Sequence, residues 1–374
     1  MKHFYGLRIT LNTMLLSMTT GLLLISSSVA VAEMKNKLTF SGNELHQIYD
    51  TEEFVHDPSA LFVFDNRLIG YSSGSAGIGL QGIEVVLNES VAERFVPIFK
   101  DKEPDWVDTI QVWNQTHEFD VPAVYQNGRY VFYTVYDETD TLGEFNNIQD
   151  AIAIVKNLGN PDQPQWKDLG IVIQSKGEKL DMPRAMDPAI LQDEETLYLV
   201  FGSHSGGIYL TELDAKTLKL KDYPHLTDTA AKQERFVHLA QHMSSDGEES
   251  EIEAPYLYKH GMYYYLFVNW GSCCRGIDSS YNIRIGRSKN IQGPYLDKRQ
   301  KHMRTGGGTL FLTSLGRYIG PGHVGIVQIE DRQILTYHYY DGNDDGISKL
   351  AARELLWNKQ GWPELGQHLI KPDR

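Results

Sequence analysis

Residues 255–268 read PYLYKHGMYYYLFV, and this stretch decides the fold. An aromatic and apolar run follows the proline, a polar turn at His260 and Gly261 interrupts it, and a second run rich in aromatic residues completes it. Residues 188–201, PAILQDEETLYLVF, repeat the same order with an acidic turn at 193–195. Two such runs joined by a short polar turn are typical of a β-hairpin.

The same pattern occurs five times along the chain, and each copy opens with a proline. The spacings between these prolines are 64, 66, 67 and 66 residues, for Pro58, Pro122, Pro188, Pro255 and Pro321. A fixed period without long helical stretches indicates a repeat architecture, and about 65 residues accommodate roughly four strands with their loops. The sequence therefore predicts an all-β fold, a five-bladed β-propeller.

Three carboxylates and a histidine stand near the heads of these repeats: Asp57, Asp187, Glu253 and His323. The first strand of every propeller blade lines the central axis, so these side chains are expected to converge there. A single Asp-Pro pair is more often structural, because it is common at turns and strand starts. Carboxylates crowded at one place raise one another's pKa, and such an arrangement is usually retained for chemistry. Their recurrence in register therefore favours a catalytic role.

The N-terminal segment resembles an export signal. Lys2 and Arg8 precede an apolar stretch at 15–25, and small residues at 30–32 predict a signal peptide over residues 1–32. A single propeller catalytic domain is then expected over residues 33–374. No apolar run reaches the ~20 residues of a membrane-spanning helix, and the net charge of −14 argues against nucleic acid or anionic membrane as a partner. We expect a secreted or periplasmic protein.

The two cysteines, Cys273 and Cys274, are adjacent. Consecutive Cα atoms lie about 3.8 Å apart, below the usual disulfide range of about 4.4–6.8 Å. The pair can therefore form only a strained vicinal disulfide or remain as two reduced thiols, and the sequence leaves both alternatives open.

Several further motifs share the repeats with these residues. They are His56-Asp57-Pro58-Ser59, Met186-Asp187-Pro188, Ile252-Glu253-Ala254-Pro255-Tyr256, GSCCRG at 271–276, YNIRIGRS at 281–288, GGGT at 306–309, GPGH at 320–323, and a C-terminal run with Arg353, Leu355, Trp357, Gly361, Trp362 and Pro363. Together they resemble glycoside hydrolase family 43, and within it the arabinan endo-1,5-α-L-arabinosidases. The resemblance covers roughly residues 50 to 365.

This resemblance implies a five-bladed propeller that hydrolyses arabinan or arabino-oligosaccharides with inversion. It implies that Asp57 is the general base, Glu253 the general acid, and Asp187 the carboxylate that orients the acid and keeps its pKa high. Inverting enzymes hold acid and base about 6.5–9.5 Å apart, so that a water fits beneath the anomeric carbon. The acid must be protonated and the base ionised at the working pH.

His323 has two interpretations. A histidine in a Gly-Pro-Gly-His turn is usually a structural residue, whereas the resemblance implies a calcium or similar cation in the central cavity beside it. Calcium prefers oxygen ligands, so we expect water to supply most of the coordination.

Two segments depart from the family pattern. Asp120-Val121-Pro122-Ala123 replaces a segment like Trp-Ala-Pro-Asp, and His204-Ser205 follows Gly202-Ser203 where relatives commonly carry an aromatic pair. Because these changes could alter sugar binding, three functions stay open. They are an endo-arabinanase, an exo-acting α-L-arabinofuranosidase or β-xylosidase, and a carbohydrate-binding propeller without hydrolysis.

A helix is expected at about residues 230–242, beside the acid. His238 and His242 have the spacing of zinc-protease ligands, but Leu239 occupies the position of the required glutamate, so we expect no zinc site. Three tryptophans in loops or at strand ends are candidates for stacking on sugar rings: Trp106, Trp113 and Trp270.

Overall fold

A computed structural model describes residues 48–49, 54–65, 67–74, 79–86, 92–111, 117–137, 149–176, 183–221 and 235–371. All of them belong to one compact unit, Glu44–Arg374. The expected signal peptide over 1–32 lies outside the described residues, and the domain bounds 33–374 stay a prediction. The described part of the chain contains no helix long and apolar enough to cross a bilayer.

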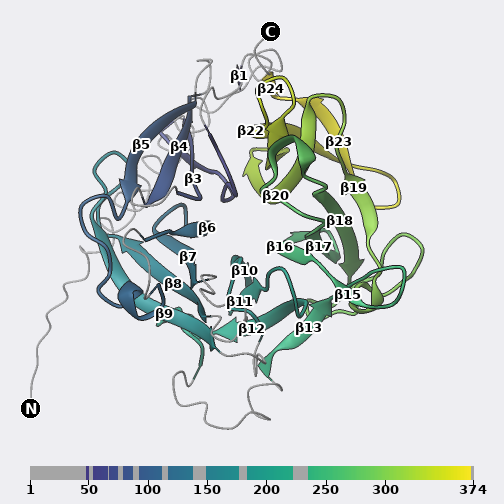
Figure 1. The fold of residues 1–374 in the computed structure, drawn as a ribbon, viewed down its shortest axis with the longest axis horizontal. Coiled ribbons are helices and arrows are strands. Elements are labelled where there is room, and N and C mark those ends of the chain that lie inside the picture. The colour runs from purple at the N-terminus through teal and green to yellow at the C-terminus, as the bar shows by residue number, and fades with distance from the viewer. Residues whose placement is uncertain are drawn as a thin grey trace, which may run out of the picture. The chain divides into compact units, whose positions relative to one another are not determined.

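Five four-stranded antiparallel sheets follow one another around a ring, which confirms the predicted all-β, five-bladed propeller (Figure 1). The first blade has β2 (Phe62–Phe64), β3 (Arg67–Ser72), β4 (Leu80–Val86) and β5 (Ala92–Ile98), and the second has β6 (Asp120–Tyr125), β7 (Tyr130–Asp137), β8 (Gln149–Asn157) and β9 (Trp166–Lys176). The third has β10 (Ala189–Asp193), β11 (Thr196–Phe201), β12 (Ile208–Leu213) and β13 (Val237–Ala240). The fourth has β16 (Ile252–His260), β17 (Tyr263–Trp270), β18 (Asn282–Ser288) and β19 (Thr309–Leu312), and the fifth has β20 (Tyr318–Ile329), β21 (Arg332–Asp341), β22 (Ile347–Trp357) and β23 (Pro363–His368).

Short elements lie outside the blades. β1 (Ile48–Tyr49) pairs in parallel with β24 (Ile370–Lys371), and β14 (His242–Met243) pairs with β15 (Glu249–Ser250). Within the described residues there are three short 3₁₀ helices, η2 (Val107–Thr109), η3 (Gly276–Asp278) and η4 (Met303–Thr305). The β1–β24 pair joins the beginning of the propeller to its end. The Val55 N–H donates to the Ser348 carbonyl at 2.8 Å and closes the ring at a second place.

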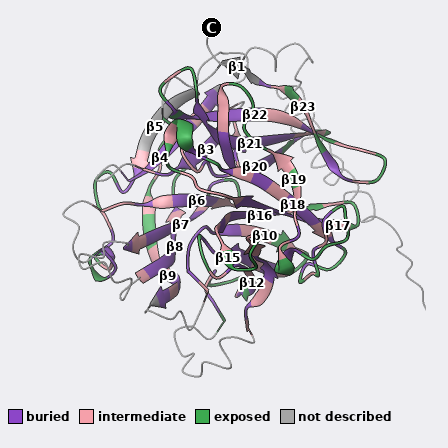
Figure 2. Cartoon of the chain, turned by 45° about the vertical axis from the view of Figure 1, so that its right-hand side comes forward, coloured by how far each residue is buried: buried purple, intermediate pink, exposed green. Residues whose placement is uncertain are grey.

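The hydrophobic core is divided into layers between neighbouring blades. Leu199 belongs to the cluster shared with the second blade, whereas Val200, the next residue of β11, belongs to the cluster shared with the fourth. Tyr265 and Leu266 of β17 divide in the same way between the fifth and third blades. Successive strand residues point to opposite faces, so an apolar strand serves two interfaces. Figure 2 shows in purple the buried residues that run along the strands.

Each blade contains a non-glycine residue with positive φ at its entrance. These residues are Asp57, Val121, Asp187, Ala254 and His323, with φ between 45° and 61°. Such a conformation is uncommon outside glycine, so its fivefold recurrence marks structurally equivalent positions. A proline follows the first four, but Val324 follows His323. Pro321 is therefore not the structural counterpart of the other prolines, because Val324 occupies their position in the fifth blade.

The helix predicted at 230–242 is wrong over residues 237–242, although Arg235 is helical. Residues 237–240 form β13, which pairs with β12 as the fourth strand of its blade. His242 belongs to the small β14–β15 sheet. The requirement of the third blade for an outer strand overrides the local helical spacing of the histidines.

Candidate active site

The polar groups at the axis come from two consecutive residues at the entrance of each blade. These pairs are His56-Asp57, Asp120-Val121, Met186-Asp187, Glu253-Ala254 and Gly322-His323. The second residue of each pair is the one with positive φ. The structure thus brings together all four residues that the sequence singled out, and it adds His56 and Asp120. Electrostatic contacts join Asp57 with Asp187, Glu253 and His323.

A cyclic set of hydrogen bonds fixes these positions relative to one another. The backbone N–H at each position donates to a side chain: Val121 to Ser73 Oγ (3.0 Å), Asp187 to Thr134 Oγ1 (3.1 Å), Ala254 to Asp187 Oδ2 (2.9 Å), His323 to Asn269 Oδ1 (3.1 Å) and Asp57 to His338 Nδ1 (3.1 Å). Every bond links one blade to the blade before it. The circle therefore holds the axis residues rigidly across the blade boundaries.

Asp57 has the surroundings of an ionised carboxylate. Its Oδ2 accepts from Ser73 Oγ at 3.1 Å and contacts His56 Nδ1 at 2.8 Å, and its Oδ1 lies 3.3 Å from His323 Nδ1. Burial by itself would raise the pKa of Asp57, but His56 and His323 hold that pKa well below its usual value. A buried, ionised carboxylate can take a proton from water.

Glu253 has the opposite tendency. Burial and the charge of Asp57 raise the pKa of Glu253, although hydrogen bonds from Tyr281 and Ser203 act against the rise. The Ser203 hydroxyl donates to Glu253 Oε2 at 3.1 Å. Burial and the charge of Glu253 raise the pKa of Asp187 to about 7. Because Asp187 and Glu253 interact, they titrate as a pair and retain a proton near neutrality.

Asp120 is a fourth carboxylate that the sequence analysis did not place at the site. Burial raises its pKa to about 7, and the charges of Asp57 and Glu118 add to the rise. Asp120-Val121-Pro122 and Glu253-Ala254-Pro255 stand in the same register, one residue before the position of positive φ. The signal in the sequence was the offset from the proline, because Asp120 stands two residues before Pro122 as Glu253 does before Pro255.

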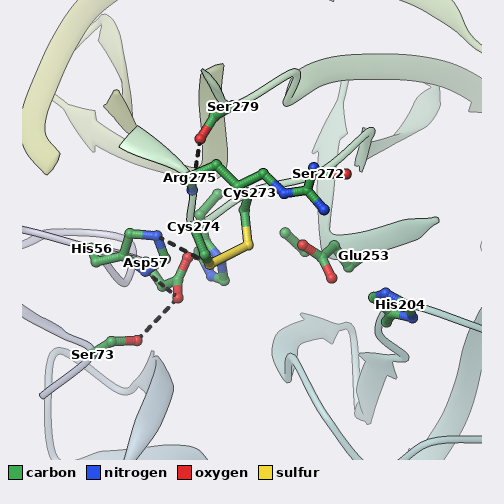
Figure 3. The surroundings of a disulfide bond; sticks show 12 residues. His56, Asp57, Ser73, His204, Glu253, Ser272, Cys273, Cys274, Arg275 and Ser279 are labelled. Atoms are coloured by element: carbon green, nitrogen blue, oxygen red, sulfur yellow. Dashed lines mark hydrogen bonds and ion pairs between the residues drawn. A yellow bond between two sulfur atoms is a disulfide. The ribbon is translucent and has the colours of Figure 1, made fainter. Parts of the chain in front are cut away.

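His204 was noted only as a departure, yet it lies beside the acid (Figure 3). Its charge lowers the pKa of Glu253, and its ring is 3.9 Å from Glu251 Oε1. With 60% of its side chain exposed, His204 can contact a bound substrate.

The groups around Asp57 could contribute one carboxylate and several imidazoles to the expected cation. Ligand atoms of His56, Asp57 and His338 lie within 4.8 Å of one another, and His323 faces the same carboxylate. His338 Nδ1 accepts the Asp57 N–H, and its buried Nε2 has no hydrogen-bond partner. In this cluster only Asp57 offers oxygen, whereas calcium takes about 6–8 oxygen ligands. The residues fit a cation that keeps most of its coordinated water.

The structure joins Cys273 and Cys274 in a vicinal disulfide, with a Cα–Cα distance of 3.8 Å. Figure 3 shows this bond between the side of the site that carries Asp57 and the side that carries Glu253. Of the two alternatives that the sequence left open, the disulfide is the one found.

The candidate stacking tryptophans have other contacts. The His242 ring stacks on Trp270 with a centroid distance of 3.9 Å, and the Arg284 guanidinium lies 4.5 Å from the same ring. Trp106 donates to Asp168 at 3.2 Å and belongs to the core between the first two blades. Trp113 lies outside the described residues. Trp106 and Trp270 are therefore engaged within the protein.

A propeller whose axis holds an ionised carboxylate and a proton-bearing carboxyl pair has the groups that a glycoside hydrolase needs. Comparison with known proteins agrees with this class. The family model described as Glycosyl hydrolases family 43 matches residues 100–363. The chain belongs to this family, and it is a glycoside hydrolase.

Curated relatives and solved structures carry related names. An extracellular exo-α-(1→5)-L-arabinofuranosidase of Cellvibrio japonicus is 35% identical over 84% of this chain and 86% of its own length. An extracellular endo-α-(1→5)-L-arabinanase of Bacillus subtilis is 32% identical over 84% of this chain and 88% of its own length. The solved endo-arabinanase of Bacillus licheniformis is 32% identical with a TM-score of 0.70, covering 85% of this chain and 99% of that structure.

Proposed function

We propose that this protein hydrolyses α-1,5-linked L-arabinan or arabino-oligosaccharides with inversion at the anomeric carbon. The observation that carries the proposal is the opposite pKa tendency of two carboxyl groups at one axis, lowered at Asp57 and raised at Glu253. Two groups whose environments separate their pKa values are suited to base and acid roles. A solved Cellvibrio cellulosa α-L-arabinanase, 28% identical to this chain, is complexed with arabinohexaose, which supports the substrate class.

The chemistry assigns one role to each carboxyl group. Asp57 accepts a proton from the attacking water, while Glu253 gives a proton to the leaving oxygen of the glycosidic bond. Asp187 accepts the Ala254 N–H at 2.9 Å, so it fixes the backbone directly after the acid. The same carboxylate opposes ionisation of Glu253 and helps to keep the acid protonated.

Endo and exo cleavage are both supported by relatives of similar identity. We favour endo cleavage from the motif resemblance. The exo alternative is supported by His204-Ser205, which stand where the family pattern commonly has an aromatic pair.

Product analysis tests both the activity and the mode of cleavage. Purified protein is incubated with linear arabinan, and the products are separated by chromatography. Mixed oligosaccharides support endo cleavage and arabinose alone supports exo cleavage. An unchanged polymer would contradict hydrolysis and leave a carbohydrate-binding propeller.

We further propose a hydrated calcium or similar cation at the axis, beside His323, with water supplying most of its coordination. Such a cation would add positive charge beside the carboxylates and link blades that meet at the axis. Dialysis against a chelator is expected to lower the melting temperature and activity, with recovery on adding calcium, and His323→Ala is expected to act similarly. Unchanged stability and rates, with no metal by elemental analysis, would refute the cation.

We also propose that the protein is exported, because the segment at 1–32 has the features of a signal peptide. Two relatives with extracellular names support this location. Expression in a bacterial host, followed by N-terminal sequencing of the exported protein, is expected to find Glu33 as the first residue. An uncleaved protein that stays inside the cell would contradict the proposal.

A further inference from the structure

A continuous chain of hydrogen bonds connects the disulfide to Asp57. The Cys274 N–H donates to the Tyr340 hydroxyl at 2.7 Å. The same hydroxyl lies 2.8 Å from His56 Nε2, and His56 Nδ1 lies 2.8 Å from Asp57 Oδ2. Three contacts therefore lead from a loop of the fourth blade, through β21 of the fifth blade, to the start of the first.

The chemistry of the donors gives this chain a direction. A backbone N–H can only donate, so the Tyr340 oxygen accepts from Cys274 and keeps its own proton for a second partner. When that proton goes to His56 Nε2, the His56 proton is on Nδ1 and points to Asp57. The hydrogen bond on one ring nitrogen thereby selects the nitrogen that serves the carboxylate.

The loop that carries the Cys274 amide is tightly constrained. The disulfide closes a ring between consecutive residues, and Cys274 itself has a positive φ of 64°. The Arg275 N–H donates to Ser279 Oγ at 3.0 Å, and the Ser272 N–H donates to Ser280 Oγ at 3.1 Å. A loop tied at these points offers its amide from a fixed place, although Cys274 is exposed.

The His56 ring is also held flat. It stacks on His338 with a centroid distance of 4.3 Å and an interplanar angle of 19°. Stacking fixes the plane of the ring, while the Tyr340 contact fixes its rotation within that plane. The two constraints together set the direction of Nδ1 toward Asp57.

We propose that the vicinal disulfide Cys273–Cys274 positions the general base, by holding the Cys274 amide on Tyr340 and, through Tyr340 and His56, the carboxylate of Asp57. The proposal rests on the role of Asp57 in the proposed function. Tyr340, His56 and the disulfide are positioning residues, since they act through Asp57. Small displacements of a reacting group cost about 100-fold in rate when they approach 1 Å.

Reduction of the disulfide is the most direct perturbation. A dithiol such as dithiothreitol supplies two electrons and two protons, so the disulfide becomes two thiols and the reagent becomes its cyclic disulfide. The reduced protein is expected to lose about 10- to 100-fold in kcat on arabinan with KM changed less than about twofold, because orientation of the base is lost while the sugar contacts remain. Reoxidation is expected to restore kcat.

Three variants separate positioning from general damage. Tyr340→Phe, the double variant Cys273→Ser/Cys274→Ser, and their combination are compared, with circular dichroism and thermal unfolding to verify the fold. Each variant is expected to lower kcat by a similar factor. The combination is expected to lower kcat no further than either change alone, since all of them interrupt the same series of hydrogen bonds from Cys274 to Asp57. Ser288→Ala is the matched control, because it removes a serine hydroxyl of the fourth blade that accepts from the Asn290 N–H and makes no described contact with this loop. A folded cysteine-free variant with full kcat would overturn the proposal.

A second readout does not depend on turnover. Nitrogen-15 NMR of the histidine rings is recorded before and after reduction, with His56 assigned from a His56→Gln variant. The His56 ring signals are expected to move, while those of His260, which stacks on Trp357 at the end of β16 away from Glu253, stay in place. Unmoved His56 signals would overturn the proposal. A protein that leaves arabinan intact but shows the shift would refute only the proposed function.

Discussion

Removal of the Ser203 hydroxyl is expected to move the pH profile toward higher pH. Ser203 donates to Glu253 Oε2 at 3.1 Å, a contact that favours the ionised form of the acid. Ser203→Ala therefore raises the pKa of Glu253 further. As pH rises the acid loses its proton and kcat/KM falls. A higher pKa of Glu253 therefore moves this basic limb of the profile to higher pH.

The size of the shift follows from the contact. A hydrogen bond to a charged group contributes about 1.5–3 kcal/mol, and about 1.4 kcal/mol corresponds to one pKa unit. Glu253 is only partly buried, so water can replace some of the lost interaction. We therefore take the lower value and expect a shift of about one unit.

The assay measures kcat/KM on a short arabino-oligosaccharide between pH 4 and 10, which reports the ionisation of the free enzyme. Ser288→Ala is the control. Ser288 is buried in the fourth blade, which also carries Glu253, and among the contacts described its hydroxyl accepts only from the Asn290 N–H. An aryl arabinofuranoside whose leaving group needs no proton is expected to show no shift. A basic limb that stays in place or moves down in Ser203→Ala would refute the assignment of Glu253 as the acid.

Four other variants test catalysis and stability. Asp57→Asn and Glu253→Gln are each expected to lower kcat on arabinan by several orders of magnitude without unfolding the protein, whereas Glu253→Gln keeps most of its rate on an activated aryl glycoside; full activity of Asp57→Asn on arabinan would contradict the base assignment. Arg184→Met is expected to cost about 3–5 kcal/mol in the free energy of unfolding, measured in urea, because it leaves the Asp150 carboxylate buried without its ion-pair partner. Arg332→Met removes a more exposed ion pair and is expected to cost about 1 kcal/mol or less, so equal losses would contradict the burial argument.

The fold was predictable because each blade repeats its local pattern. The alternation of side chains in β11 and β17 appears directly as apolar runs, and the repeat length gave the number of blades. Pro321 showed the limit of this reasoning, because the position of the other four prolines is occupied by Val324 in the fifth blade, which only the tertiary structure reveals. The expected helix before β14 failed for a similar reason, since pairing with β12 is a tertiary requirement.

The surroundings of the site were less predictable than its carboxylates. The three catalytic candidates lie one or two residues before a repeat proline, whereas many of their partners come from other blades. His56 and Tyr340 are separated by 284 residues, and Ala254 and Asp187 by 67. No local pattern encodes such contacts. Asp120 was within reach of sequence reasoning, because its offset from Pro122 equals that of Glu253 from Pro255.

The stereochemistry of the first product tests the central claim most directly. Proton NMR during hydrolysis of an arabino-oligosaccharide identifies the anomer released before mutarotation mixes the two forms. Direct attack of water activated by Asp57, opposite the bond protonated by Glu253, predicts an inverted β-anomer from an α-linked substrate. A retained α-anomer would require a covalent intermediate and would contradict the roles assigned to both residues.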